Sequence, residues 1–166
     1  MIPNLRLKDY LLIALLLLTC WCFSPSPAFA LLRQHHESPG VLRYHAQQSI
    51  QDQNGSAWQV VLFPKAQEEP VTTYNLRLVA FPGAAKFRHP QPLEITLTTG
   101  EILIARDVFT QEAPAPNVGQ FNFMPILPYL PQKQPLQLHI ALQNNQNLTL
   151  DIPYSIQLEW QFLSNI

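Results

Sequence analysis

The sequence predicts a mainly β protein, built as a single antiparallel β-sandwich or small barrel. Short segments between residues 41 and 152 alternate apolar and polar side chains with the period of two that is typical of strands. Turn-forming Asn, Gly and Pro residues separate these segments, and no segment before residue 150 has a convincing helical period. Many short strands between such turns favour a sandwich or a barrel.

The first two expected strands form a hairpin. They lie near 41–50 and 57–63, on either side of Asn54 and Gly55. A type I′ turn needs positive φ at both of its central residues, and Asn followed by Gly tolerates this best. We therefore expect a tight type I′ hairpin at this point.

Five more strands follow the same pattern, which gives seven in all. Each has one apolar face and one wetter face, because successive side chains of a strand point to opposite sides of the sheet. They are expected at 74–80, 95–97, 102–104, 136–142 and 148–152.

The tail after Pro153 fits two structures. Apolar residues alternate over 154–162, as in a strand. The spacing of Ile156, Trp160 and Leu163 fits a helix equally well, with Pro153 at its start. We expect a strand that becomes a short C-terminal helix at its end.

The first thirty residues have the layout of a signal peptide. Two basic residues precede a run of thirteen mostly apolar residues at 11–23, and small residues follow at Ala28 and Ala30. We predict cleavage after Ala30 and export to a periplasm or thylakoid lumen. The expected organisation is a cleaved signal peptide at 1–30, a flexible leader at 31–40 and a single β domain at 41–166.

Two alternatives to cleavage remain open. The segment is an uncut membrane anchor in the first, although thirteen apolar residues are fewer than the roughly 20 that span a bilayer. Cys20 carries a lipid in the second, although Leu18 and Thr19 stand where small residues are preferred.

Cleavage would remove both cysteines, Cys20 and Cys22. The mature protein would then have no disulfide, no thiolate metal site and no cysteine nucleophile. It would keep eight basic and ten acidic side chains, a net charge of about −2. This charge does not favour binding to nucleic acid.

Residues 113–131, APAPNVGQFNFMPILPYLP, are rich in both proline and large apolar residues. The prolines at 125, 128 and 131 repeat every three residues, as in a polyproline helix. The structural interpretation is that this segment covers an open end or edge of the sheet. The functional interpretation is a docking surface for another protein or a membrane. The candidate contact residues are Phe121, Phe123, Met124, Pro125, Ile126, Leu127, Pro128, Tyr129, Leu130 and Pro131.

Reactive chemistry is not indicated. The histidines lack the spacing of a hydrolytic zinc site, and no serine lies in a nucleophile elbow. We therefore predict no catalytic residue, no cofactor or metal site and no enzyme activity. Lys86 and Arg88 are candidates for contact with an anionic group, and a solvated basic loop is the alternative.

Several segments carry a resemblance: HESPGVLRYHAQQSIQD, LRLVAFPG, HPQPLEI and, most specifically, DVFTQEAPAPNVGQF. In these the chain resembles a family of small exported cyanobacterial proteins that is classed only as a domain of unknown function. The resemblance covers nearly the whole mature chain and implies a thylakoid-lumen or periplasmic setting. It supplies no activity, cofactor or catalytic residue.

The expected function is that of a non-catalytic exported β domain that binds another macromolecule, as an accessory or assembly factor of a membrane complex. The alternative is a carrier of a small apolar ligand, held in an interior cavity lined by residues such as Trp58, Tyr74 and Phe81.

Overall fold

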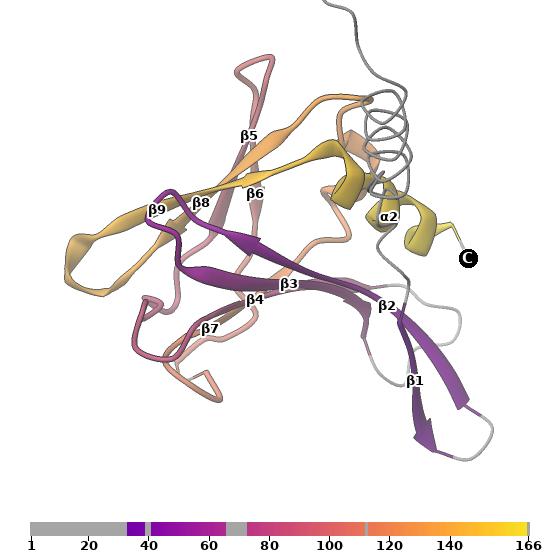
Figure 1. The fold of residues 1–166 in the computed structure, drawn as a ribbon, viewed down its shortest axis with the longest axis horizontal. Coiled ribbons are helices and arrows are strands. Elements are labelled where there is room, and N and C mark those ends of the chain that lie inside the picture. The colour runs from indigo at the N-terminus through magenta and orange to yellow at the C-terminus, as the bar shows by residue number, and fades with distance from the viewer. Residues whose placement is uncertain (1–32, 39–40, 66–72, 112, 166) are drawn as a thin grey trace, which may run out of the picture.

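The structure is a computed structural model that describes residues 33–38, 41–65, 73–111 and 113–165. Two antiparallel sheets lie over one another as the layers of a β-sandwich, with a helix at one end (Figure 1). Among the described strands, the sheets remain two layers and do not form a closed barrel. The predicted mainly β sandwich is thus confirmed, and the barrel alternative is wrong.

The first sheet has the strand order β1-β2-β3-β4-β7, in which β1 pairs with the outer side of β2. Its strands are β1 (Arg33–Ser38), β2 (Val41–Gln51), β3 (Ala57–Pro64), β4 (Tyr74–Ala80) and β7 (Val118–Asn122).

The second sheet has the order β6-β5-β8-β9. Its strands are β5 (Leu93–Leu97), β6 (Ile102–Ala105), β8 (Leu136–Ala141) and β9 (Asn147–Ile152). Two 3₁₀ turns, η1 (Leu127–Tyr129) and η2 (Gln143–Asn145), and the helix α2 (Tyr154–Ser164) complete the described elements. All seven strands expected from the alternation are present.

Two strands were not expected. β1 lies within the segment predicted to be a leader, where the polar sequence has no two-residue period. β7 lies within the proline-rich segment, and its residues from Val118 to Phe121 are buried whichever way they point. A strand that is buried on both faces gives no alternation to detect.

The β2–β3 hairpin is present, but the prediction of a type I′ turn is wrong. Only Gly55 has a positive φ, of 79°, and Asn54 does not. Gly55 N donates to Asp52 O at 2.9 Å, and Asp52 N donates to Ser56 O at 3.0 Å, the pattern of a type I turn followed by a glycine bulge. The Asp52 carboxylate favours this turn because it accepts from the N–H groups of Asn54 and Ser56, both at 2.9 Å.

The core lies between the sheets and is built from the inner faces of the alternating strands. Each strand places every second side chain in it, as β3 does with Trp58, Val60 and Leu62. The largest fully buried side chains are Trp58, Trp160, Phe123, Leu62, Leu76, Leu78, Leu93, Ile95, Leu136, Leu138, Ile140 and Leu150.

On one side of the sandwich, the segment that follows β6 connects the two sheets by hydrogen bonds to β7. After β6 the chain crosses to the first sheet, where Asp107 lies opposite Phe121 of β7. Asn122 N donates to Arg106 O and Val108 N donates to Gln120 O, both at 2.8 Å. The backbone ladder therefore continues from one layer into the other.

The tail is helical from Tyr154 onward, so the expected initial strand was wrong. Ile156, Trp160 and Leu163 are buried, and the residues that suggested alternation, Leu158 and Phe162, are exposed. The helix prevails because it places the three largest apolar groups of its inner face in the core. No helix among the described residues is long and apolar enough to span a membrane.

Candidate docking surface

After β7 the proline-rich segment folds into compact turns. Three of its backbone hydrogen bonds join residues three apart: Ile126 N to Phe123 O (2.9 Å), Tyr129 N to Ile126 O (2.9 Å) and Leu130 N to Leu127 O (3.4 Å). A fourth joins Leu127 N to Phe123 O, four residues apart, at 3.3 Å. The expected polyproline helix is therefore wrong here. A 3₁₀ helix also has three residues per turn, so the same spacing of prolines fits both structures.

The ten candidate contact residues of this segment divide into two groups. Phe121, Phe123, Ile126, Leu127 and Leu130 are buried, Pro131 is half-buried, and Met124, Pro125, Pro128 and Tyr129 are exposed. The buried group belongs to the core or its margin. Only the exposed group can meet a partner directly, and Tyr129, which is 61% exposed, is its largest member.

A surface groove of about 390 Å³ runs between this segment and the end of α2. We call it the η1–α2 groove. Its lining residues are Met124, Leu127, Pro128, Leu130, Gln132, Gln161, Ser164 and Asn165. One wall is apolar and the other carries amide and hydroxyl groups, and none of the lining side chains is charged.

The α2 wall of the groove is fixed by buried contacts. Trp160 packs against Phe123, and the Tyr74 hydroxyl donates to Leu163 O at 3.0 Å. The buried Gln157 side chain donates through Nε2 to Gln134 O at 2.9 Å and to Ile152 O at 3.2 Å. These bonds tie the helix to both the first sheet and the chain entering β8.

The outer face of α2 carries exposed apolar side chains. Leu158 and Phe162 are one helical turn apart, and Phe162 is 60% exposed. Between them Glu159 is half-buried and accepts a hydrogen bond from Gln48 Nε2 at 2.8 Å. Burial raises the pKa of Glu159, and the hydrogen bond from Gln48 partly offsets this rise.

Lys86 and Arg88 lie elsewhere. They lie beside the carboxyl end of β8, where Gln143 N donates to Lys86 O (2.8 Å) and Arg88 N donates to Ala141 O (3.2 Å). Lys86 is exposed, and Arg88 donates through Nη1 to Asn145 Oδ1 at 2.9 Å. The η1–α2 groove lies before the start of β8, so the structure does not bring the two candidate surfaces together.

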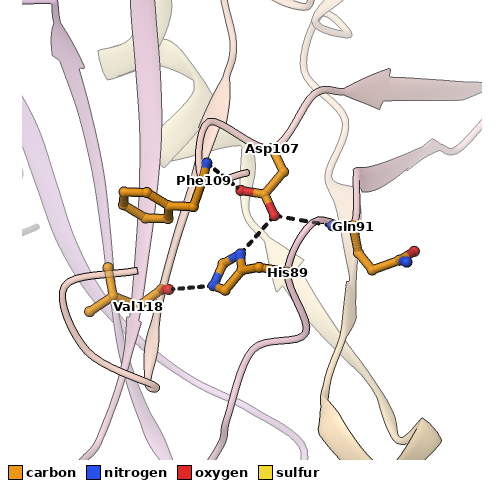
Figure 2. A network of polar contacts seen from close by, with 5 residues as sticks. All are labelled: His89, Gln91, Asp107, Phe109 and Val118. Carbon is orange, nitrogen blue, oxygen red and sulfur yellow. Dashed lines mark hydrogen bonds and ion pairs between the residues drawn. The ribbon is translucent and has the colours of Figure 1, made fainter. Parts of the chain in front are cut away.

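The most polar cluster of the described interior joins His89 to Asp107 (Figure 2). His89 Nδ1 lies 2.7 Å from Asp107 Oδ2, and His89 Nε2 lies 3.2 Å from Val118 O. Asp107 also accepts from Gln91 N at 3.1 Å and from Phe109 N at 2.9 Å. Figure 2 shows the two side chains pointing at one another from separate loops.

This cluster has the composition of a catalytic dyad but not its accessibility. The side chains of His89 and Asp107 are 8% and 4% exposed. Both ring nitrogens face oxygen atoms, so neither is free to exchange a proton with a substrate. His89 also stacks on Phe87 and meets Phe109 edge-on. The arrangement therefore ties two loops to β7 and has no evident reactive role.

Sequence reasoning missed this pair because eighteen residues separate its members, and no local pattern links them. Within the part of the chain that the structure describes, no three His, Cys, Asp or Glu side chains are placed to hold a metal ion.

Comparison with known proteins gives one result. No curated protein and no solved structure matches the chain. A family model described as "Protein of unknown function (DUF3122)" matches residues 30–163. This range contains both sheets, the proline-rich segment and nearly all of α2. The resemblance to a domain of unknown function is confirmed, and the chain belongs to the DUF3122 family.

Proposed function

We propose that this chain is a non-catalytic exported β domain of a cyanobacterium that binds another macromolecule, as an accessory or assembly factor of a membrane complex. The observation that carries the proposal is the η1–α2 groove. It combines an apolar wall with a wall of neutral hydrogen-bonding groups on α2, and buried contacts hold that helix in place.

The neutral lining favours a protein segment over a charged ligand. Gln132, Gln161 and Asn165 can hydrogen-bond to backbone amides, while Leu127 and Leu130 offer apolar contact. Tyr129, which lies between the lining residues Pro128 and Leu130 in the chain, is of a residue type that dominates binding energy at protein interfaces.

Export after cleavage at Ala30 is part of the proposal, to a periplasm or a thylakoid lumen. The signal-peptide layout of residues 1–30 supports it, and so does the start of the family match at residue 30. Intact mass of the exported protein tests it. A chain that begins at Leu31 is expected, and a mass that includes residues 1–30 would contradict cleavage.

The carrier alternative receives less support from the described residues. Trp58 and Tyr74 are buried within the packed core, and Trp58 meets Phe87 edge-on with ring centroids 6.0 Å apart. Phe81 is 65% exposed on the surface, so it does not line an interior. Two of the three residues expected around a ligand thus fill the core, and the third lies outside it.

Site-specific photo-crosslinking tests the docking surface. A benzophenone amino acid replaces Met124 or Gln161, which line the two sides of the groove, in the exporting cell, and Phe81, which is exposed just after the end of β4, is the control position. We expect a discrete, reproducible protein adduct from the two groove positions and none from position 81. Equal adducts from all three positions, or none from any, would contradict the proposal.

A further inference from the structure

Among the strands that the structure describes, β6 has an open outer edge. The strand pairs with β5 on one side only. Gly100 N donates to Leu97 O and Leu97 N donates to Glu101 O, both at 2.9 Å, which makes 97 and 101 a hydrogen-bonded pair.

The direction of the β6 backbone groups follows from this pair. Hydrogen-bonded pairs alternate along an antiparallel ladder, so the next ones are 95 with 103 and 93 with 105. The N–H and C=O groups of Ile102 and Ile104 therefore point away from β5.

Farther along the chain, the backbone groups on this same side already have hydrogen-bond partners. Arg106 O and Val108 N, which also point away from β5, are bonded to β7. β7 ends at Asn122, and the next residue turns toward β4, where Phe123 N donates to Tyr74 O at 2.8 Å. Ile102 and Ile104 thus lie just past the end of β7, and their four backbone groups have no partner among the described residues.

The side chains at this edge are apolar and accessible. Ile102 is 57% exposed and Ile104 is 53% exposed. Edge strands in natural proteins are usually protected by lysine, proline, a bulge or a covering segment. β6 itself, Ile-Leu-Ile-Ala, has neither a charge nor a proline.

We propose that the open edge of β6 receives an extended strand from a partner protein, with apolar side chains at the alternate positions that pair with Ile102 and Ile104. An incoming strand satisfies all four backbone groups and covers both isoleucines at once, because residues of a hydrogen-bonded pair share one face of the sheet. This inference uses a surface distinct from the η1–α2 groove and does not depend on the function proposed for it.

The geometry favours a partner strand over a second copy of the chain. Two-fold pairing of β6 with itself, with Ile102 opposite Ile104, would place Gly100 of the copy opposite Arg106. That position is already taken, because Asn122 N is bonded to Arg106 O. A separate strand can end its pairing at Ile104.

The charges at the ends of β6 specify the charge that a partner strand needs at each end. Glu101 precedes the strand, Arg106 follows it, and both are exposed. A strand antiparallel to β6 has its carboxyl end beside Glu101 and its amino end beside Arg106. A basic residue at the carboxyl end of the partner strand therefore fits best.

Peptide titration with a backbone-blocking control tests the proposal. The probe is the acetylated, amidated hexapeptide Thr-Val-Thr-Val-Thr-Lys, added to the ¹⁵N-labelled protein and followed by amide chemical shifts. Two control peptides each carry two N-methyl groups. The first is methylated on both valines, and the second is methylated on the threonines at its third and fifth positions. Pairing through the valines predicts shifts centred on the amides of Ile102 and Ile104.

N-methylation of the valines should weaken binding at least about tenfold, because each lost backbone hydrogen bond costs on the order of 1 kcal/mol. N-methylation of the threonines should leave affinity within about threefold, since these N–H groups face solvent in the complex. Equal losses for the two methylated peptides, or shifts that avoid β6, would overturn the proposal.

A protein variant supplies the second measurement. Ile104→Pro removes an N–H that bonds to no residue of the described chain, and an edge strand tolerates proline at such a position. The variant should stay folded by circular dichroism and bind the probe at least about tenfold more weakly. Wild-type binding in this variant would overturn the proposal. A dimer of the unliganded wild type that Ile104→Pro abolishes would also overturn it, by assigning the edge to a second copy.

Discussion

The indole ring of Trp160 meets the phenyl ring of Phe123 edge to face, with ring centroids 5.1 Å apart and an interplanar angle of 76°. Both side chains are fully buried, and they come from α2 and from the proline-rich segment. Edge-to-face pairs of this kind contribute about 0.5–1.5 kcal/mol beyond the area they bury. The pair therefore fixes the helix relative to the proline-rich segment.

Phe123→Ala should lower the free energy of unfolding by about 3–5 kcal/mol, because it removes a buried ring and leaves a cavity beside Trp160. Urea denaturation followed by tryptophan fluorescence measures the change. Tyr129→Ser, in the exposed part of the same segment, is the matched control and should change stability by no more than about 0.5 kcal/mol. Similar losses of stability for the two variants would contradict the division of this segment into buried and exposed residues.

Asp107→Ala should destabilise the protein by about 3 kcal/mol, because it removes three hydrogen bonds that contribute on the order of 1 kcal/mol each. It leaves His89 and the N–H groups of Gln91 and Phe109 without their acceptor. Guanidinium denaturation measures the effect, and Asp151→Ala is the control because Asp151 is exposed on β9. If both variants unfold at the wild-type midpoint, the cluster does not tie the loops together.

Asp52 should make stability depend on pH in acid. Burial alone would raise its pKa, but hydrogen bonds from Trp58 Nε1 and from the N–H groups of Ser56 and Asn54 together lower it below the ordinary value of 3.8. The stabilisation is then present above about pH 3.8 and is lost as the pH falls through the lowered pKa. Asp52→Asn should flatten this part of the stability curve between pH 2 and 5. An unchanged curve in urea titrations would refute the assignment.

Glu159 should act in the opposite direction. Because burial raises its pKa, the folded state favours the protonated carboxyl, and the associated stability is lost as the pH rises from the ordinary value of 4.5 through the raised pKa. Glu159→Gln keeps an oxygen acceptor for Gln48 without the charge. The variant should therefore gain stability relative to wild type as the pH rises from 4 to 7. A difference that does not change with pH would contradict this assignment.

Gly119→Ala should destabilise the sandwich by about 1–3 kcal/mol, through overpacking. A Cβ at this position would lie less than 3.0 Å from three ring atoms of Phe87. Gly83→Ala is a useful contrast, since a Cβ there meets no atom within 4 Å and the cost comes only from its φ of 87°. Thermal unfolding of Gly119→Ala with and without Phe87→Leu checks the cause. The smaller side chain should recover part of the loss, and no recovery would show that the ring is not the obstacle.

The alternation of apolar and polar residues predicted the strands that have one buried face and one solvent-exposed face. It could not predict β7, because Val118 to Phe121 are buried on both faces, with Gln120 accepting two bonds from the Arg77 guanidinium at 3.1 and 2.7 Å. The 3₁₀ turns of the proline-rich segment were missed because their three-residue period equals that of a polyproline helix.

The candidate surface was only half predictable. Its proline-rich wall stood out by composition, whereas its second wall, α2, is brought there by tertiary contacts such as that of Tyr74 with Leu163, 89 residues away. The open edge of β6 was invisible for the same reason, because strand order depends on pairing between distant segments.

The position of α2 in the chain has a consequence for biosynthesis. Its buried face, which includes Trp160 and Leu163, closes one end of a core whose strands all precede it in the sequence. During translation those strands leave the ribosome first. The nascent chain therefore exposes apolar surface until the helix emerges. We therefore expect any dependence on chaperones to be greatest just before residue 154 is released.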